Sequence, residues 1–134
     1  MLNPLIPCRT FPNSCCKTAS ISGLFGDYGI AAYNAMKAAL LNYSGALSQD
    51  LAPKGIRVNA VSPGPIMVEG GAWDRIKTHM KQFYDATLAQ IPLGRMGQPD
   101  EVAATVAMLV SPRSGFTTGT NVVVDGGITK RIQY

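Results

Sequence analysis

The chain has 134 residues, enough for one domain; 46% of them are hydrophobic and 15% are charged, below the roughly 25% charged of an average globular domain. Its 12 basic and 8 acidic residues are scattered, which argues against a nucleic-acid surface, and the apolar surplus suggests subunit contacts. No apolar run approaches the roughly 20 residues of a membrane span. The three cysteines lie near the start, far from the single histidine, which excludes a disulfide framework and a metal site. We therefore expect a cytoplasmic protein that binds no nucleic acid, membrane or metal.

The first predicted elements are an irregular leader and a long helix. Residues 1–17 contain three prolines, no acidic residue and no hydrophobic period, so we expect them to be irregular. Residues 31–52 are rich in alanine and leucine and lack proline, which predicts a helix that ends at Pro53 and Gly55. Because its apolar residues occupy more than one face, we expect this helix to be buried on most sides.

The rest of the chain alternates strands and helices. Residues 56–62 are apolar and β-branched, as in a strand covered on both faces of a parallel sheet. Residues 72–90 carry apolar and aromatic side chains at three- and four-residue spacing, which predicts one helix. A further helix begins at Gln98, before a proline and two acids, and continues to Val110, and residues 121–125 form a short apolar strand. This order predicts an α/β domain with parallel strands and helical crossovers.

Tyr33 and Lys37 are the first candidates for chemistry. They are four residues apart on the long predicted helix, so their side chains lie on one face. An ammonium group near a phenol favours the ionised phenol, which suits general acid and base catalysis. On spacing alone, however, an ordinary exposed pair of helical side chains is the favoured interpretation, so a catalytic role needs further residues.

Four segments supply that context. The segment TASISGLFGDYGIAAYNAMKAAL places Ser20 thirteen residues before Tyr33, and it is followed in order by RVNAVSPGPI, PLGRMGQPDEVA and GTNVVVDGG. Over residues 18–127 the chain resembles the carboxyl-terminal half of a short-chain dehydrogenase/reductase. The resemblance implies a partial Rossmann-like parallel sheet, made of the last strands and helices of a doubly wound α/β fold.

The resemblance also implies an activity and a set of residues. The chain would be an oxidoreductase that uses NAD or NADP to interconvert a carbonyl and a secondary alcohol, and it would be a homo-oligomer if the full domain exists. Tyr33 would be the general acid and base, Ser20 would hydrogen-bond the same carbonyl oxygen, and Lys37 would bind the nicotinamide ribose. Ser22, two residues further on, would be structural. The implied cofactor-binding residues are Tyr33, Lys37, Pro63, Gly64 and Ile66.

Departures from the family pattern lead us to expect a shortened chain. No glycine-rich phosphate loop follows a strand, the family's asparagine before the serine strand is missing, and Val68 replaces a cofactor-contacting threonine. We therefore divide the chain into a non-family leader, residues 1–17, and the carboxyl-terminal half of a dinucleotide-dependent oxidoreductase domain, residues 18–134. Such a chain would have little activity alone, with one sheet edge and one face of the long helix uncovered. The alternative is a non-catalytic fragment that acts only in oligomerisation or interaction.

The sequence says less about the substrate than about the reaction. By the resemblance, residues 68–90 would shape the substrate pocket, and Trp73, Phe83 and Tyr84 in this segment favour an apolar substrate. The residues that distinguish NAD from NADP would belong to the absent half.

Overall fold

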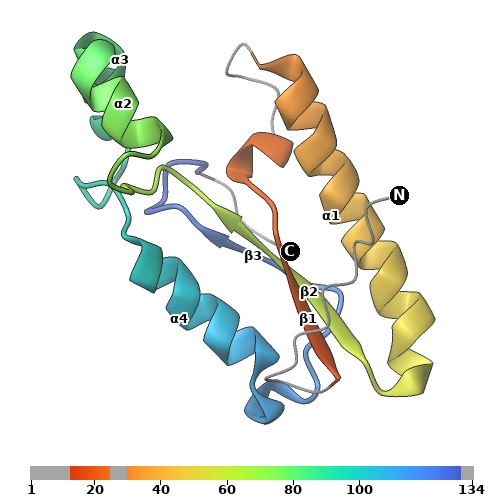
Figure 1. Ribbon diagram of the computed structural model, residues 1–134. Helices are drawn as coiled ribbons and strands as arrows, with labels where there is room; N and C mark the ends of the chain where they lie inside the picture. The colour runs from red at the N-terminus through yellow and green to blue at the C-terminus, as the bar shows by residue number, and fades with distance from the viewer. Residues whose placement is uncertain (1–12, 25–29, 131–134) are drawn as a thin grey trace.

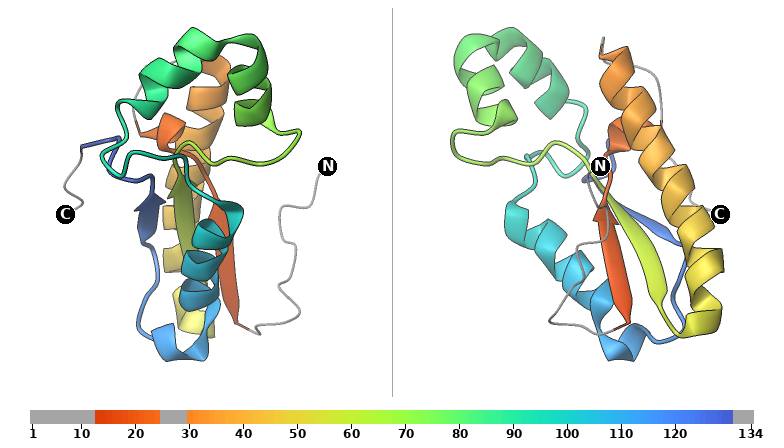
Figure 2. Two further views of the ribbon diagram at one scale, coloured as in Figure 1. Left: turned by 90° about the vertical axis from the view of Figure 1, so that its left-hand side faces the viewer. Right: turned by 45° about the vertical axis from the view of Figure 1, so that its right-hand side comes forward.

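Three parallel strands form the centre of the computed structural model, which describes residues 13–24 and 30–130 (Figure 1). In spatial order they are β1 (Ser14–Thr18), β2 (Arg57–Pro63) and β3 (Asn121–Val124). One face of the sheet is covered by α1 (Ala31–Leu51) and the other by α4 (Pro99–Val110). Beyond the carboxyl ends of the strands lie α2 (Ala72–His79) and α3 (Lys81–Leu88) (Figure 2). The short 3₁₀ helices are η1 (Ile21–Gly23), η2 (Ala52–Lys54) and η3 (Pro112–Ser114). The expected partial Rossmann-like α/β sheet is confirmed.

The central strand, β2, is buried along most of its length. It pairs with β1 on one side and with β3 on the other, and Val58 and Val61 are at most 1% exposed. The buried Asn59 amide donates to the Thr117 carbonyl at 2.9 Å and accepts from the Thr120 amide at 3.2 Å. These bonds satisfy a buried polar side chain and fix the loop that leads into β3.

The long helix α1 forms where the alanine-rich segment predicts it, but its predicted burial is wrong. Only Ser44 and Ser48 are buried, and Met36 is 73% exposed. One face of α1 packs on β2 and η1, whereas no element of the described chain covers the opposite face, which agrees with the other expectation, that one face of this helix is uncovered. The amino-acid composition does not distinguish a helix that is buried on all sides from one with an uncovered apolar face, because both are rich in apolar residues.

The strand β1 corrects the prediction that residues 1–17 are irregular. Residues 14–17 belong to a strand, paired from Ser14 with Arg57 to Thr18 with Val61, while residues 1–12 lie outside the described part of the chain. The segment SCCKT has no alternation of its own, and its conformation comes from the hydrogen bonds of β2. Its cysteines, Cys15 and Cys16, form no disulfide.

The single helix predicted over residues 72–90 is also wrong, because it breaks into α2 and α3 at Met80 (φ −135°, ψ 51°). Trp73 and Leu88 both pack on a buried cluster that contains Ile21. In one straight helix these two residues would be about 22 Å apart at 1.5 Å per residue, too far to reach the same cluster. The break therefore brings both ends of the segment to one core, and the Trp73 and Phe83 rings stack 6.1 Å apart.

The helix predicted from Gln98 is confirmed as α4. Its first turn is held by Glu101, which accepts from the Gln98 amide at 2.8 Å and from the Arg95 guanidinium at 2.6 Å. The hydrogen bond from Arg95 is the main reason why the pKa of Glu101 falls from its ordinary 4.5 to about 2. At the other end, Arg57 donates to the carbonyls of Leu109, Ser111 and Thr117. No helix in the described chain is long and apolar enough to cross a bilayer.

Candidate active site

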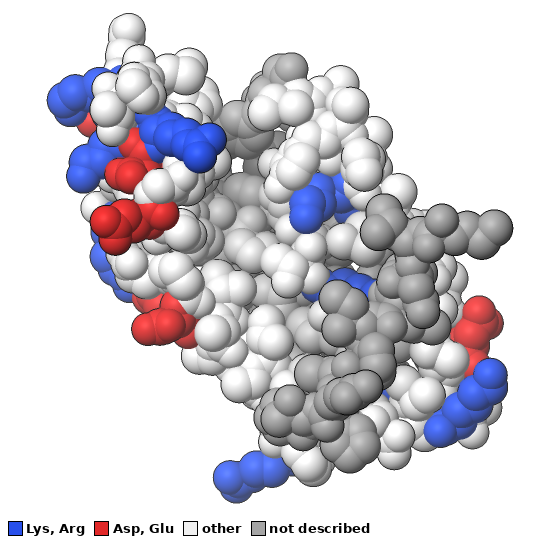
Figure 3. Space-filling view, viewed as in Figure 1, with Lys and Arg blue, Asp and Glu red and all other residues white. Residues whose placement is uncertain are grey.

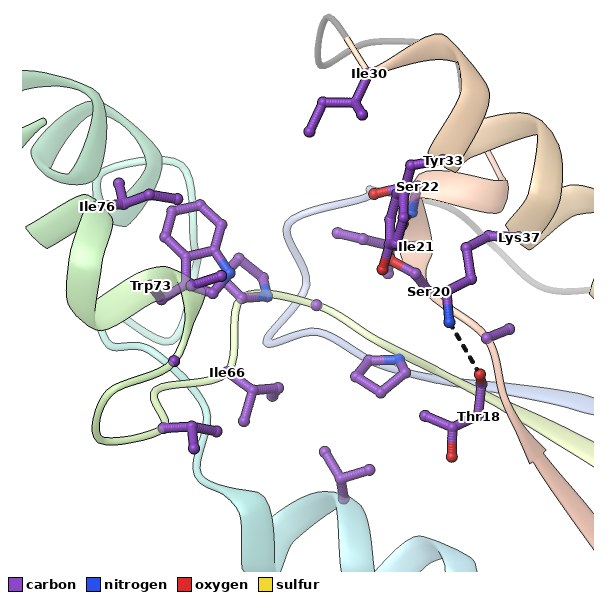
Figure 4. Close-up of a pocket in the computed structure, with 18 of the residues that line it drawn as sticks. Thr18, Ser20, Ile21, Ser22, Ile30, Tyr33, Lys37, Ile66, Trp73 and Ile76 are labelled. Atoms are coloured by element: carbon purple, nitrogen blue, oxygen red, sulfur yellow. Dashed lines mark hydrogen bonds between the residues drawn. The ribbon is translucent and has the colours of Figure 1, made fainter.

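A pocket of about 860 Å³ opens at the carboxyl ends of the strands, between the start of α1 and the α2–α3 pair. In parallel α/β sheets, ligands bind at this edge. Figure 4 shows side chains from both sides of the pocket, with those of η1 and α1 facing those of α2. All of the predicted catalytic and cofactor-binding residues line it, whereas Tyr84, predicted with Trp73 and Phe83 to shape the substrate pocket, does not. The lining residues of the first group are Ser20, Tyr33, Lys37, Pro63, Gly64 and Ile66.

Ser20 is positioned by the strand that precedes it. The Ala19 amide donates to the Val61 carbonyl at 2.7 Å, which continues the β1–β2 pairing up to the pocket. Ser20 then caps η1, and its Oγ accepts a hydrogen bond from the Ser22 amide at 3.2 Å. Because this bond uses only the acceptor capacity of Oγ, the Ser20 hydroxyl can still donate into the pocket.

Tyr33 and Lys37 share one face of the first turns of α1. The Lys37 Nζ lies 5.6 Å from the centroid of the Tyr33 ring and donates to the Thr18 carbonyl at 3.2 Å, as Figure 4 shows. This bond joins the ammonium to the end of β1, on the same side of the pocket as Ser20. The lysine keeps further N–H donors for a ligand and places a positive charge beside the phenol.

Gly23 allows η1 and α1 to come together. A Cβ at this position would lie 2.7 Å from the Lys37 carbonyl carbon and 2.8 Å from the Ala38 amide nitrogen. Distances below 3.0 Å do not occur between such atoms, so no residue with a Cβ fits without movement of main chain. The glycine therefore sets the distance between the Ser20 segment and the Tyr33–Lys37 helix.

The turn after β2 forms the floor of the pocket. The Gly64 amide donates to the Val124 carbonyl at 2.9 Å, and a Cβ at Gly64 would lie 2.6 Å from the Cβ of Asp125. Ile66 forms an isolated parallel bridge with Gly97. These main-chain contacts hold the Pro63–Ile66 turn in one position against β3 and the start of α4.

The side of the pocket across from Tyr33 is apolar. It includes Val68, which is 47% exposed, and the stacked pair Trp73 and Phe83. Lys37 is the only charged residue that lines the pocket within the described chain. Sequence reasoning anticipated the pocket-shaping segment, which contains Ile76, but it gave no site role to several other lining residues. Among these are Ile30, Asn34 and Val102, of which only Asn34 had a signal, its position directly after Tyr33.

The parallel sheet, with a tyrosine and a lysine at its carboxyl edge, defines a Rossmann-like α/β protein. A family model described as enoyl-(acyl carrier protein) reductase matches residues 4–129, a match that begins before Thr18, where we placed the start of family-like sequence. The chain belongs to the short-chain dehydrogenase/reductase family.

Individual relatives agree with this assignment. Isoepoxydon dehydrogenase from Aspergillus clavatus is 50% identical over 104 residues, which are 78% of this chain and 40% of that protein. A glucose/ribitol dehydrogenase of the family from Brucella melitensis is 41% identical with a TM-score of 0.74, over 86% of this chain and 44% of that one. YwfH, an NADPH-dependent reductase of bacilysin biosynthesis, is 30% identical with a TM-score of 0.79, over 87% and 47%. The chain thus spans less than half the length of these proteins.

Proposed function

We propose that this chain carries the proton-transfer and substrate-binding half of an NAD(P)-dependent oxidoreductase that interconverts a carbonyl and a secondary alcohol. The observation that carries the proposal is that Ser20, Tyr33 and Lys37 line one pocket, two of them joined through the end of β1. The Tyr33 hydroxyl would give its proton to the carbonyl oxygen, and the Ser20 hydroxyl would donate a hydrogen bond to the same oxygen. The Lys37 ammonium would stabilise the negative charge that the phenol then acquires.

The residues present fit the nicotinamide end of the cofactor. Lys37 offers N–H donors of the kind that ribose hydroxyls accept, and the Pro63–Ile66 turn presents a fixed floor beside it. When bound, NAD(H) or NADP(H) supplies the hydride. The relatives support NADP(H), since YwfH is described as NADPH-dependent. Pyrophosphate binding would need residues other than these.

The test uses the longest natural form of the protein that contains these residues. Small ketones are offered with NADH or NADPH, and the loss of nicotinamide absorbance is followed. Tyr33→Phe removes the transferable proton and should lower the rate by about 10² to 10⁴. Tyr43→Phe is a matched control, because both tyrosines lie on α1 and both are 42% exposed, yet Tyr43 does not line the pocket. Equal rates for the two variants would contradict the proposal.

The exposed face of α1 favours a second proposal, association of the chain with itself. Met36 is 73% exposed and Tyr43 is 42% exposed on this face, and contiguous apolar surface commonly marks a subunit contact. Association would be compatible with catalysis, or would be the only role of a non-catalytic fragment. Sedimentation across a range of concentrations tests it: Met36→Glu should shift the chain toward monomer, and a wild-type chain that is monomeric throughout would contradict it.

A further inference from the structure

Polar groups are distributed unevenly in the pocket. Its far side is formed by apolar side chains, whereas the side that carries Tyr33 contains Thr18 and Ser20 and, besides these, two further uncharged polar residues, Ser22 and Asn34. Neither belongs to the proton-transfer set. The only charged lining residue in the described chain, Lys37, is already engaged beside Tyr33. The pocket therefore offers no second cation for a phosphate or carboxylate, and an uncharged substrate fits it best.

Both polar side chains lack a hydrogen-bond partner within the part of the chain that the structure describes. The Asn34 Oδ1 is buried, and it has no hydrogen bond to any residue in the described ranges 13–24 and 30–130. Within the same ranges the Ser22 hydroxyl is also unbonded, since only the Ser22 main-chain amide is engaged, by Ser20. Buried amide oxygens without a donor are rare in native proteins because they lose hydrogen bonds to water and gain nothing in return.

Neither residue is needed to hold the local backbone. The main-chain amide of Asn34 donates to the Ile30 carbonyl within the first turn of α1, which any residue could do. The bond from the Ser22 amide to Ser20 likewise uses no side-chain atom of Ser22. An apolar residue at either position would leave these bonds intact, so the local backbone does not account for the two polar side chains, both of which line the pocket.

We propose that Ser22 and Asn34 form a polar subsite for a second oxygen of the substrate, which is a neutral hydroxyketone with its hydroxyl beside the reacting carbonyl. Both residues line the same pocket as Ser20 and Tyr33, Ser22 from η1 and Asn34 from the first turn of α1, so the subsite adjoins the place where the carbonyl oxygen would bind. A hydroxyl suits it because a hydroxyl both donates and accepts, and the Asn34 amide can present oxygen or nitrogen by rotation about its last bond. The inference rests on the proposed function for the position of the carbonyl.

The chain supplies its own probe for a binding test. Trp73 is the only tryptophan of the protein and lines the pocket, so its fluorescence reports on ligands there without any cofactor or turnover. The 134-residue chain is titrated with cyclohexanone and with 2-hydroxycyclohexanone, which differ by one hydroxyl. The wild-type chain should bind the hydroxyketone about twofold to tenfold more tightly, the range for one neutral hydrogen bond.

Variants locate the source of that preference. Ser22→Ala and Asn34→Ala, made separately, should each reduce the affinity ratio while leaving the affinity for cyclohexanone unchanged. Asn42→Ala is the matched control, an exposed asparagine of α1 that does not line the pocket, and it should keep the wild-type ratio. Circular dichroism confirms that each variant is folded, and Asn34→Ser replaces Asn34→Ala if that variant is not.

Equal affinity of the wild-type chain for the two ketones, or no detectable binding of either, would overturn the inference, as would variants that keep the wild-type ratio. The proposed function fails by a different measurement, the absence of Tyr33-dependent hydride transfer in the longest natural chain. A chain that prefers the hydroxyketone yet transfers no hydride would support the proposed subsite and contradict the proposed oxidoreductase function.

Discussion

Replacement of Gly23 by alanine should show how tightly the serine segment is held against α1. The added Cβ would lie 2.7 Å from the Lys37 carbonyl carbon, whereas ordinary contact begins at 3.4 Å. One of the two segments must therefore move by about 0.7 Å, the difference between these distances. The obstructing atoms are main-chain atoms inside a helix, so no side chain can rotate away to relieve the clash.

The movement should have two measurable consequences. Overpacking of this kind typically costs about 1 to 3 kcal/mol of stability, which a urea titration followed by circular dichroism resolves. If η1 moves instead of α1, Ser20 moves with it, and a misplacement of about 1 Å near the reacting atoms can lower turnover about a hundredfold. We therefore expect Gly23→Ala to unfold at lower urea concentration and, in the longest natural chain, to lose most of its activity.

Gly45, which lies on α1 itself, gives a matched control. A Cβ at Gly45 would meet nothing within 4 Å, so Gly45→Ala should stabilise the chain by about 0.5 to 1 kcal/mol through helix propensity alone. The two glycine substitutions should thus change the stability of the chain in opposite directions. A Gly23→Ala chain as stable as the wild type would refute the reasoning, because it would mean that η1 and α1 can separate without cost.

The remaining predictions concern α4 and its supports. Because the folded pKa of Glu101 is about 2 against an ordinary 4.5, its ion pair with Arg95 stabilises the fold above pH 4.5, and this contribution is lost as the pH falls toward 2. Glu101→Gln should accordingly be less stable than wild type at pH 7 but equal to it near pH 2, and a difference that persists at low pH would rule out the charge as its cause. Arg57→Met leaves three main-chain carbonyls without their donor and should cost about 2 to 4 kcal/mol in urea unfolding, while a loss below about 0.5 kcal/mol would mean that water replaces the guanidinium.

Features fixed by local sequence could be predicted well. The alanine-rich run gives α1 within one residue of its end, and the four-residue spacing is sufficient to place Tyr33 and Lys37 on one face. Proline followed by two acids marks the start of α4, because both preferences arise within one helical turn. Local sequence alone could not predict that Ser20 lies near Tyr33. Only the family resemblance indicated it, and in the structure both residues line one pocket.

Features fixed by distant contacts could not be predicted. The break at Met80 depends on where Trp73 and Leu88 find a common core, and nothing in the three- and four-residue spacing of residues 72–90 encodes that position. The strand at residues 14–18 depends on pairing with β2, forty residues further along the chain. The buried Asn34 oxygen, which has no partner among the described residues, is likewise visible only in the folded structure.

The two sides of the pocket are attached to the fold by different kinds of contact. The proton-transfer side is held by main-chain groups, since Lys37 bonds the Thr18 carbonyl and Gly23 lies directly against the backbone of α1. On the far side, α2 and α3 make no main-chain hydrogen bond to the sheet or to α1 within the described residues, and they are held chiefly by the side chains of Trp73 and Leu88 on the Ile21 cluster. Substitutions in α2 and α3 can therefore reshape this wall of the pocket while the backbone contacts keep Ser20 and Lys37 in place. Under the proposed function, this division would explain why a short motif indicates the class of reaction, whereas the substrate must be inferred from the pocket.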